Sequence, residues 1–119
     1  MTIKKYLKTL EKNSLFKEFS ENKLSQLFKT NKHYIKEYTK DQVIHLQNEV
    51  CIFMDIILSG QVAGQKIDEN GNILTISTFT DNDIVGANLI YASRNHYPMT
   101  VMSKSNSIIL HIHKELILE

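Results

Sequence analysis

Two histidines near the end of the sequence have the spacing that a metal site could use. His111 and His113 stand two residues apart in a segment that alternates like a β-strand, so both imidazoles point to one face. Two imidazoles on one face could share a metal ion, but zinc sites need further ligands and no later histidine follows. We therefore expect the pair to face solvent, with a metal-binding enzyme that uses His111 and His113 as the alternative.

The single cysteine and the other histidines form no recognisable catalytic pattern. Cys51 has no partner for an intrachain disulfide, and an iron–sulfur cluster needs about four thiolates. We expect Cys51 to be a small buried residue at the start of a strand. His33, His45 and His96 are scattered, and no spacing pairs a nucleophile with a base. The sequence therefore predicts neither enzyme activity nor a cofactor.

The stretch that says most about function covers residues 79–100. It opens with the turn-rich residues 80–83, passes through Gly86 and a short apolar segment, and reaches the only proline, Pro98, at the start of another predicted strand. A connection of this length, with room for one turn of helix between strands, favours a binding role over simple linkage.

This stretch resembles the phosphate-binding cassette of the cyclic-nucleotide-binding fold, as found in the sensor domains of Crp/Fnr-type transcription regulators. In that family a Gly-Asp-x-x-Gly-Glu run enters a short helix, and a later Arg-Ser or Arg-Thr pair binds the cyclic phosphate. Here residues 82–87, Asn-Asp-Ile-Val-Gly-Ala, take the first position, and Tyr97-Pro98 takes the second. The frame of the cassette is retained.

Other fragments extend the resemblance over nearly the whole chain. Glu49 stands where the family has a Gly-Glu turn, and residues 57–62, Ile-Leu-Ser-Gly-Gln-Val, match the family pattern Ile-x-x-Gly-x-Val. Asn70-Gly71 falls at the usual hairpin, and residues 103–107 precede the last strand as in the family. Each fragment is weak alone, but their order and separation are specific for the fold.

The resemblance also implies that the side chains which bind a cyclic nucleotide are missing. The family arginine would fall at Tyr97, the following hydroxyl residue at Pro98, and the ribose-binding carboxylate at Ala87. A buried phosphate requires a paired cation, whereas tyrosine offers a neutral hydroxyl and proline lacks a backbone N–H. Arg94 lies three residues too early, in the loop. We therefore expect no tight binding of cyclic AMP or cyclic GMP.

The pocket that remains would be neutral and partly aromatic. Such a lining suits a small neutral or aromatic ligand, or no ligand at all if Tyr97 and Met99 simply fill the core. The candidate lining residues are Phe79, Gly86, Ala87, Asn88, Leu89, Tyr97, Met99 and Thr100.

The resemblance implies an effector-sensing domain of a bacterial regulator that is cytoplasmic and makes no membrane contact. In the family, a long helix after the roll forms a homodimer, and DNA is bound only by a C-terminal helix-turn-helix domain, which this chain lacks. The alternatives are a cupin-like metal-binding enzyme that uses His111 and His113, although the upstream glycine of that family is missing, and a β-roll that only mediates protein contacts.

The periodicity of the sequence predicts the elements that hold these residues. Residues 1–31 read as short amphipathic helices that form an N-terminal cap, with Ile3, Tyr6, Leu7 and Leu10 on one face and Ser20 as an N-cap. Residues 32–113 alternate with period two between turn signals and predict a β-roll, with Asn70-Gly71 as the clearest hairpin. Residues 114–119 resemble the start of a truncated helix. The predicted class is mainly β with N-terminal helices, a double-stranded β-helix or jelly roll.

Composition restricts the class of partner. The 119 residues suffice for one core, and a formal net charge of +1 gives no electrostatic case for binding nucleic acid or a charged membrane surface. The longest apolar run, residues 50–58, is too short to span a membrane and is interrupted by Asp55.

Overall fold

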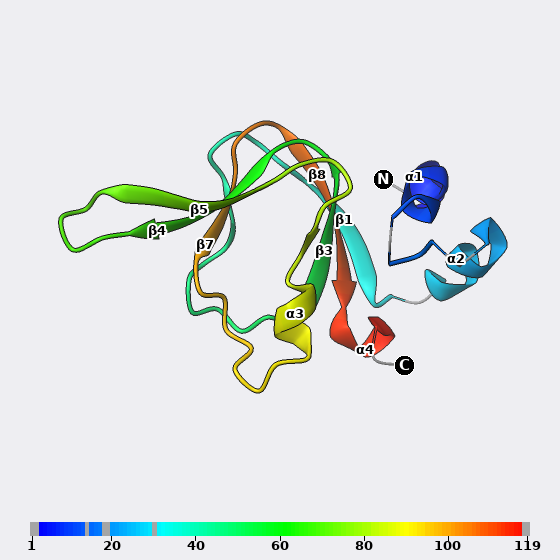
Figure 1. The fold of residues 1–119 in the computed structure, drawn as a ribbon. Coiled ribbons are helices and arrows are strands. Elements are labelled where there is room, and N and C mark those ends of the chain that lie inside the picture. Colours follow the sequence, from blue (N-terminus) through cyan, green and yellow to red (C-terminus); the bar gives the residue numbers. More distant parts are fainter. Residues whose placement is uncertain (1–2, 14, 18–19, 30, 118–119) are drawn as a thin grey trace.

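The fold is a β-roll of two four-stranded antiparallel sheets, seen in a computed structural model that describes residues 3–13, 15–17, 20–29 and 31–117 (Figure 1). The strands in these residues are β1 (His33–Tyr38), β2 (Val43–His45), β3 (Phe53–Ser59), β4 (Val62–Ile67), β5 (Ile73–Phe79), β6 (Ile84–Val85), β7 (Thr100–Ser103) and β8 (Ser107–His113). The helices are η1 (Ile3–Tyr6), α1 (Leu7–Glu11), α2 (Glu21–Leu27), α3 (Ala87–Ile90) and α4 (Lys114–Ile117).

The order of the strands explains how distant segments meet. One sheet has the order β1-β8-β3-β6, and the other has the order β2-β7-β4-β5. This arrangement confirms the predicted mainly β jelly-roll class. The two-residue strand β6 was not predicted, because it is too short to show a period of two.

The described residues of the N-terminal segment form the short helices η1, α1 and α2. Ser20 is the N-cap of α2, where its hydroxyl oxygen accepts the backbone N–H of Lys23 at 3.2 Å. Leu10 of α1 and Leu24 of α2 have no solvent exposure. None of the helices in the described part of the chain has the length and apolar character needed to cross a bilayer.

The predicted hairpin is also confirmed. It joins β4 to β5, and Gly71 adopts a φ of 81°, a left-handed conformation that glycine accepts without strain. The Asp68 carboxylate accepts the backbone N–H groups of Asn70 and Asn72 at 2.9 and 2.8 Å. The hairpin extends away from the body of the roll (Figure 1) and exposes Ile67, Ile73, Leu74 and Ile76.

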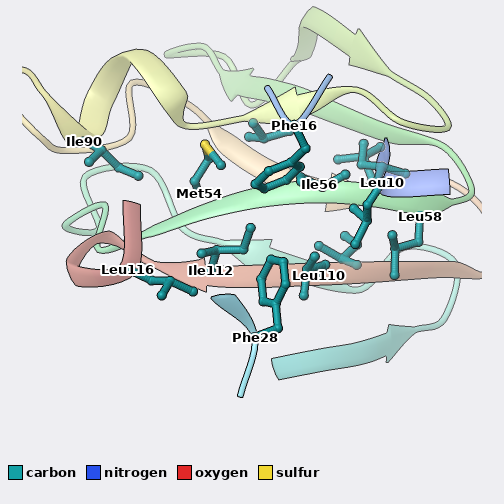
Figure 2. Close-up of a cluster of buried hydrophobic side chains, with 14 of the residues drawn as sticks. Leu10, Phe16, Phe28, Met54, Ile56, Leu58, Ile90, Leu110, Ile112 and Leu116 are labelled. Atoms are coloured by element: carbon teal, nitrogen blue, oxygen red, sulfur yellow. The ribbon is translucent and has the colours of Figure 1, made fainter. Parts of the chain in front are cut away.

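Strand β3 is buried on both faces. Met54, Ile56 and Leu58 share one face, where they pack with side chains of β8 and the helical cap; Figure 2 labels ten residues of this cluster, Leu10, Phe16, Phe28, Met54, Ile56, Leu58, Ile90, Leu110, Ile112 and Leu116. The alternation of β3 was predicted correctly, but its other face, which carries Asp55 and Ile57, is buried as well. Asp55 therefore lies in the interior of the protein.

We expect Leu110→Ala to destabilise the domain strongly, because Leu110 is fully buried. Removing such a side chain should lower the free energy of unfolding by about 2–5 kcal/mol. Ile73→Ala is the matched control, since Ile73 is 65% exposed on the hairpin, and it should change stability by no more than about 0.5 kcal/mol. Urea unfolding followed by circular dichroism measures both variants, and equal losses would show that the assigned core is wrong.

Candidate functional site

The stretch between β5 and β7 is anchored to the interior by its first turn. The backbone N–H of Asn82 bonds to the Ile57 carbonyl at 2.6 Å, and the N–H of Ile57 bonds to the Asp83 carbonyl at 3.0 Å. Gly86 is the N-cap of α3 with a φ of 90°, and a Cβ there would come within 3.2 Å of the Cys51 sulfur. A glycine is therefore required where the cassette enters its short helix.

A cavity of about 240 Å³ lies beside this helix. Its lining includes six of the eight predicted residues, Phe79, Gly86, Asn88, Leu89, Tyr97 and Met99, together with Ser77, Ile84, Val85 and Pro98. Ala87 does not line the cavity and packs against the core, while the Thr100 hydroxyl accepts the N–H of Gln47. That these residues bind a ligand stays a prediction.

Tyr97, which the resemblance places where the family has arginine, is directed into the protein. Only 1% of its surface is exposed, and its ring stacks on the imidazole of His45 with centroids 4.4 Å apart. Burial raises the pKa of its hydroxyl, so the phenol is neutral. The hydroxyl oxygen lies 3.4 Å from the sulfur of Cys51, whose predicted burial is confirmed.

Among the described residues, no Lys or Arg lines this cavity, so its lining carries no cationic side chain. Arg94 lines a neighbouring cavity of about 570 Å³ instead, together with Asn48, Ser93 and His96. The two cavities share Leu89, Tyr97 and Pro98. The guanidinium of Arg94 is thus near the predicted pocket without lining it.

A second group of polar side chains lies deep between the sheets. Asp55 is 1% exposed, and its two carboxylate oxygens contact Nε2 of His45 at 2.5 Å and Nδ1 of His111 at 2.6 Å. We call these three residues the His-Asp-His cluster. His45 comes from β2, while Asp55 and His111 are opposite each other in the register of β3 and β8.

The expectation that His111 faces solvent is wrong. The residue is fully buried, because the face of β8 that carries it is covered by the other sheet and its carboxylate partner is there. His113 is only partly buried, and its Nδ1 accepts the backbone N–H of Glu115 at 3.1 Å. The two histidines of the predicted pair therefore have different partners.

In both histidines of the cluster, the ring nitrogen that does not contact Asp55, called the outer nitrogen here, also has a hydrogen-bond partner. Nδ1 of His45 lies 2.6 Å from a carboxylate oxygen of Glu49, and Nε2 of His111 lies 2.8 Å from the hydroxyl of Tyr38. Both nitrogens of His45 face carboxylates, which only accept hydrogen bonds, so a protonated ring can donate to both of them. Burial alone would lower the pKa of His45, but bonding to Asp55 and Glu49 outweighs it and raises the pKa.

Aromatic rings enclose the cluster, and a surface cavity reaches it. Tyr34 stacks on His111 with centroids 4.6 Å apart, as Tyr97 does on His45. A cavity of about 310 Å³ is lined by Tyr34, Tyr38, His45 and Glu49 among others. The described residues therefore contain two candidate sites, the cavity beside α3 and the His-Asp-His cluster.

Sequence reasoning missed the cluster, although one signal for it was present. Asp55 interrupts an apolar run, and a charged residue in a strand buried on both faces must find partners of opposite charge or hydrogen-bond donors. Its partners could not be identified from spacing, because His45 and His111 lie 10 and 56 residues away in the sequence.

Comparison with known proteins agrees with this architecture. The model of the cyclic nucleotide-binding domain family matches residues 35–119. The sensor domain of the transcriptional regulator DNR from Pseudomonas aeruginosa has a TM-score of 0.85 at 15% identity, covering 99% of this chain and 78% of that chain. A transcriptional regulator from Thermotoga maritima has a TM-score of 0.69 at 26% identity, with 80% and 72% covered.

The catabolite activator protein from Thermus thermophilus has a TM-score of 0.70 at 14% identity, and the match covers 87% of this chain but only 47% of that longer protein. No curated protein sequence matches the chain. The match to the family model covers most of the chain, and the frame of the cassette and the roll agree with it. The chain therefore belongs to the cyclic nucleotide-binding domain family, with the fold of the sensor domains of Crp/Fnr-type transcription regulators.

Proposed function

We propose that this chain is the effector-sensing domain of a Crp/Fnr-like transcription regulator whose cassette has lost the ability to bind cyclic nucleotides. The proposal rests on Tyr97, which the resemblance places at the position of the phosphate-binding arginine and whose side chain is neutral, buried and stacked on His45. Its ring is held by the core and cannot turn outward to meet a phosphate without leaving a large void.

Electrostatics supports the same conclusion. A cyclic phosphate brings a full negative charge, and burying it without a paired cation costs several kcal/mol. The helix α3 has only four residues, and among the described residues no Lys or Arg lines the cavity. The cavity therefore offers no cationic side chain to compensate for the charge.

The same cavity suits a small uncharged ligand. Phe79, Leu89 and Met99 supply apolar surface, while Ser77 and Asn88 supply polar groups at its edge. Its volume of about 240 Å³ lies below the range of about 300–1,000 Å³ that is typical for drug-sized ligands. A single aromatic ring with one polar substituent is the kind of molecule that fits.

In a full-length regulator, we infer that such a ligand acts through a homodimer and a C-terminal DNA-binding domain outside this chain. The domain itself is proposed to be non-catalytic. A cupin-like enzyme built on His111 and His113 lacks support, because His113 bonds to the backbone of Glu115 and lies outside the His-Asp-His cluster.

Titration calorimetry with cyclic AMP and cyclic GMP tests the loss of nucleotide binding. We expect dissociation constants weaker than about 1 mM for both nucleotides, since this corresponds to only about 4 kcal/mol of binding free energy. Arg94→Ala is the control for the one nearby guanidinium. Micromolar binding by the unaltered chain, lost in Arg94→Ala, would show that Arg94 replaces the family arginine and would contradict the proposal.

The preference for an uncharged ligand can be measured with two probes of nearly the same shape, benzamide and benzoate. In an NMR titration, benzamide should shift the amide signals of Phe79, Leu89 and Met99, and benzoate should bind at least about tenfold more weakly, equal to about 1.4 kcal/mol. Ser77→Phe should block the cavity, because Ser77 lines it. Thr78→Phe is the matched control, because adjacent strand residues point to opposite faces and Thr78 lines a different cavity. Binding that survives Ser77→Phe, or a preference for benzoate, would refute this assignment.

A further inference from the structure

The His-Asp-His cluster has a composition and arrangement that the sensing function proposed above does not use. Nδ1 of His111, Nε2 of His45 and a carboxylate oxygen of Asp55 all lie within 4.8 Å of one another. Two imidazole nitrogens and one carboxylate oxygen are the ligands that zinc and neighbouring transition metals take in proteins. We propose that the cluster binds one divalent transition-metal ion of the iron-to-zinc range.

The hydrogen bonds around the cluster match those of ligating histidines. A metal-bound histidine usually donates its second ring N–H to an oxygen, which fixes the ring and its tautomer. Here Nδ1 of His45 faces the Glu49 carboxylate at 2.6 Å, and Nε2 of His111 faces the Tyr38 hydroxyl at 2.8 Å. Both outer nitrogens are thus held by oxygens, and both inner nitrogens converge on Asp55.

Charge balance also favours a divalent cation. Two acidic side chains contact His45, Asp55 at Nε2 and Glu49 at Nδ1. Their two carboxylates match the charge of one M²⁺ ion, and any proton that the ion displaces from a ring nitrogen is released to solvent.

Binding requires a small expansion of the cluster. Metal–ligand bonds of about 2.0–2.2 Å hold neighbouring ligand atoms about 3–3.5 Å apart, whereas the present contacts to Asp55 are 2.5 and 2.6 Å. Apart from these hydrogen bonds, His45 stacks on Tyr97 and His111 stacks on Tyr34. Stacked rings can slide along each other with little loss of contact.

An access route for the ion is present. Asp55 and His111 are almost completely buried, but the cavity of about 310 Å³ that Tyr34, Tyr38, His45 and Glu49 line opens to solvent beside them. The side chain of Glu49 is 44% exposed and carries its charge at this opening. An arriving cation therefore meets a carboxylate before it reaches the buried ligands.

The test uses the 119-residue chain after treatment with a chelator. Calorimetry with Zn²⁺ should give one site per chain, Zn²⁺ should raise the Tm, and Co²⁺ should give visible absorption bands of a low-symmetry site with nitrogen and oxygen ligands. Asp55→Asn should abolish binding. Glu49→Gln changes a side chain that is 44% exposed, so the fold should be kept, and it should weaken binding by about 10- to 100-fold.

His96→Gln and His113→Gln are matched controls, because both histidines lie outside the cluster; each should leave the Zn²⁺ affinity unchanged. If Asp55→Asn fails to fold, the Zn²⁺ affinity of Glu49→Gln compared with that of the two controls still tests the proposal. Absence of one-to-one binding, an affinity unchanged in Glu49→Gln, or an affinity lost in either histidine control would overturn the proposal.

Discussion

The interaction on which the fold depends most is the pairing of the Asp55 carboxylate between the two sheets. An ionised carboxylate at 1% exposure is unfavourable unless its oxygens are bonded, and here each oxygen is bonded to a histidine. His111 belongs to the same sheet as Asp55, but His45 belongs to the other sheet. The cluster therefore joins the two layers, and removal of one partner would leave a buried charge that costs about 3–5 kcal/mol.

This pairing also bears on the proposed loss of the phosphate-binding arginine. The ring stacked on His45 is Tyr97, which the resemblance places where the family has arginine. An aromatic face beside an imidazolium is favourable, because the ring quadrupole attracts a cation. An arginine in that place would set a second positive charge against the first. In the proposed function, the buried cluster and the family's anion site would therefore be electrostatically opposed.

The features that could be predicted from the sequence are those that depend on patterns among neighbouring residues. Three such features lie where they were expected: the period-two segments, the Asn70-Gly71 turn and the glycine at position 86. Each of them depends only on residues that are close together in the sequence. Six of the eight predicted residues line one cavity for the same reason, since the cassette is contiguous, but that they bind a ligand stays a prediction. The burial of His111 was not predictable in this way, because period two gives the face of a strand but not what covers that face.

The shared wall between the two candidate sites has a thermodynamic consequence. Tyr97 lines the cavity beside α3 and also stacks on His45 of the cluster, so neither site can change shape without affecting the same ring. An ion bound at Nε2 of His45 would take the place of a proton on the ring beneath Tyr97, and a ligand that presses on Tyr97 would shift the imidazole relative to Asp55. Any such coupling is reciprocal, because the effect of an ion on ligand affinity must equal the effect of the ligand on ion affinity. A sensor built in this way would respond to both molecules through one aromatic contact.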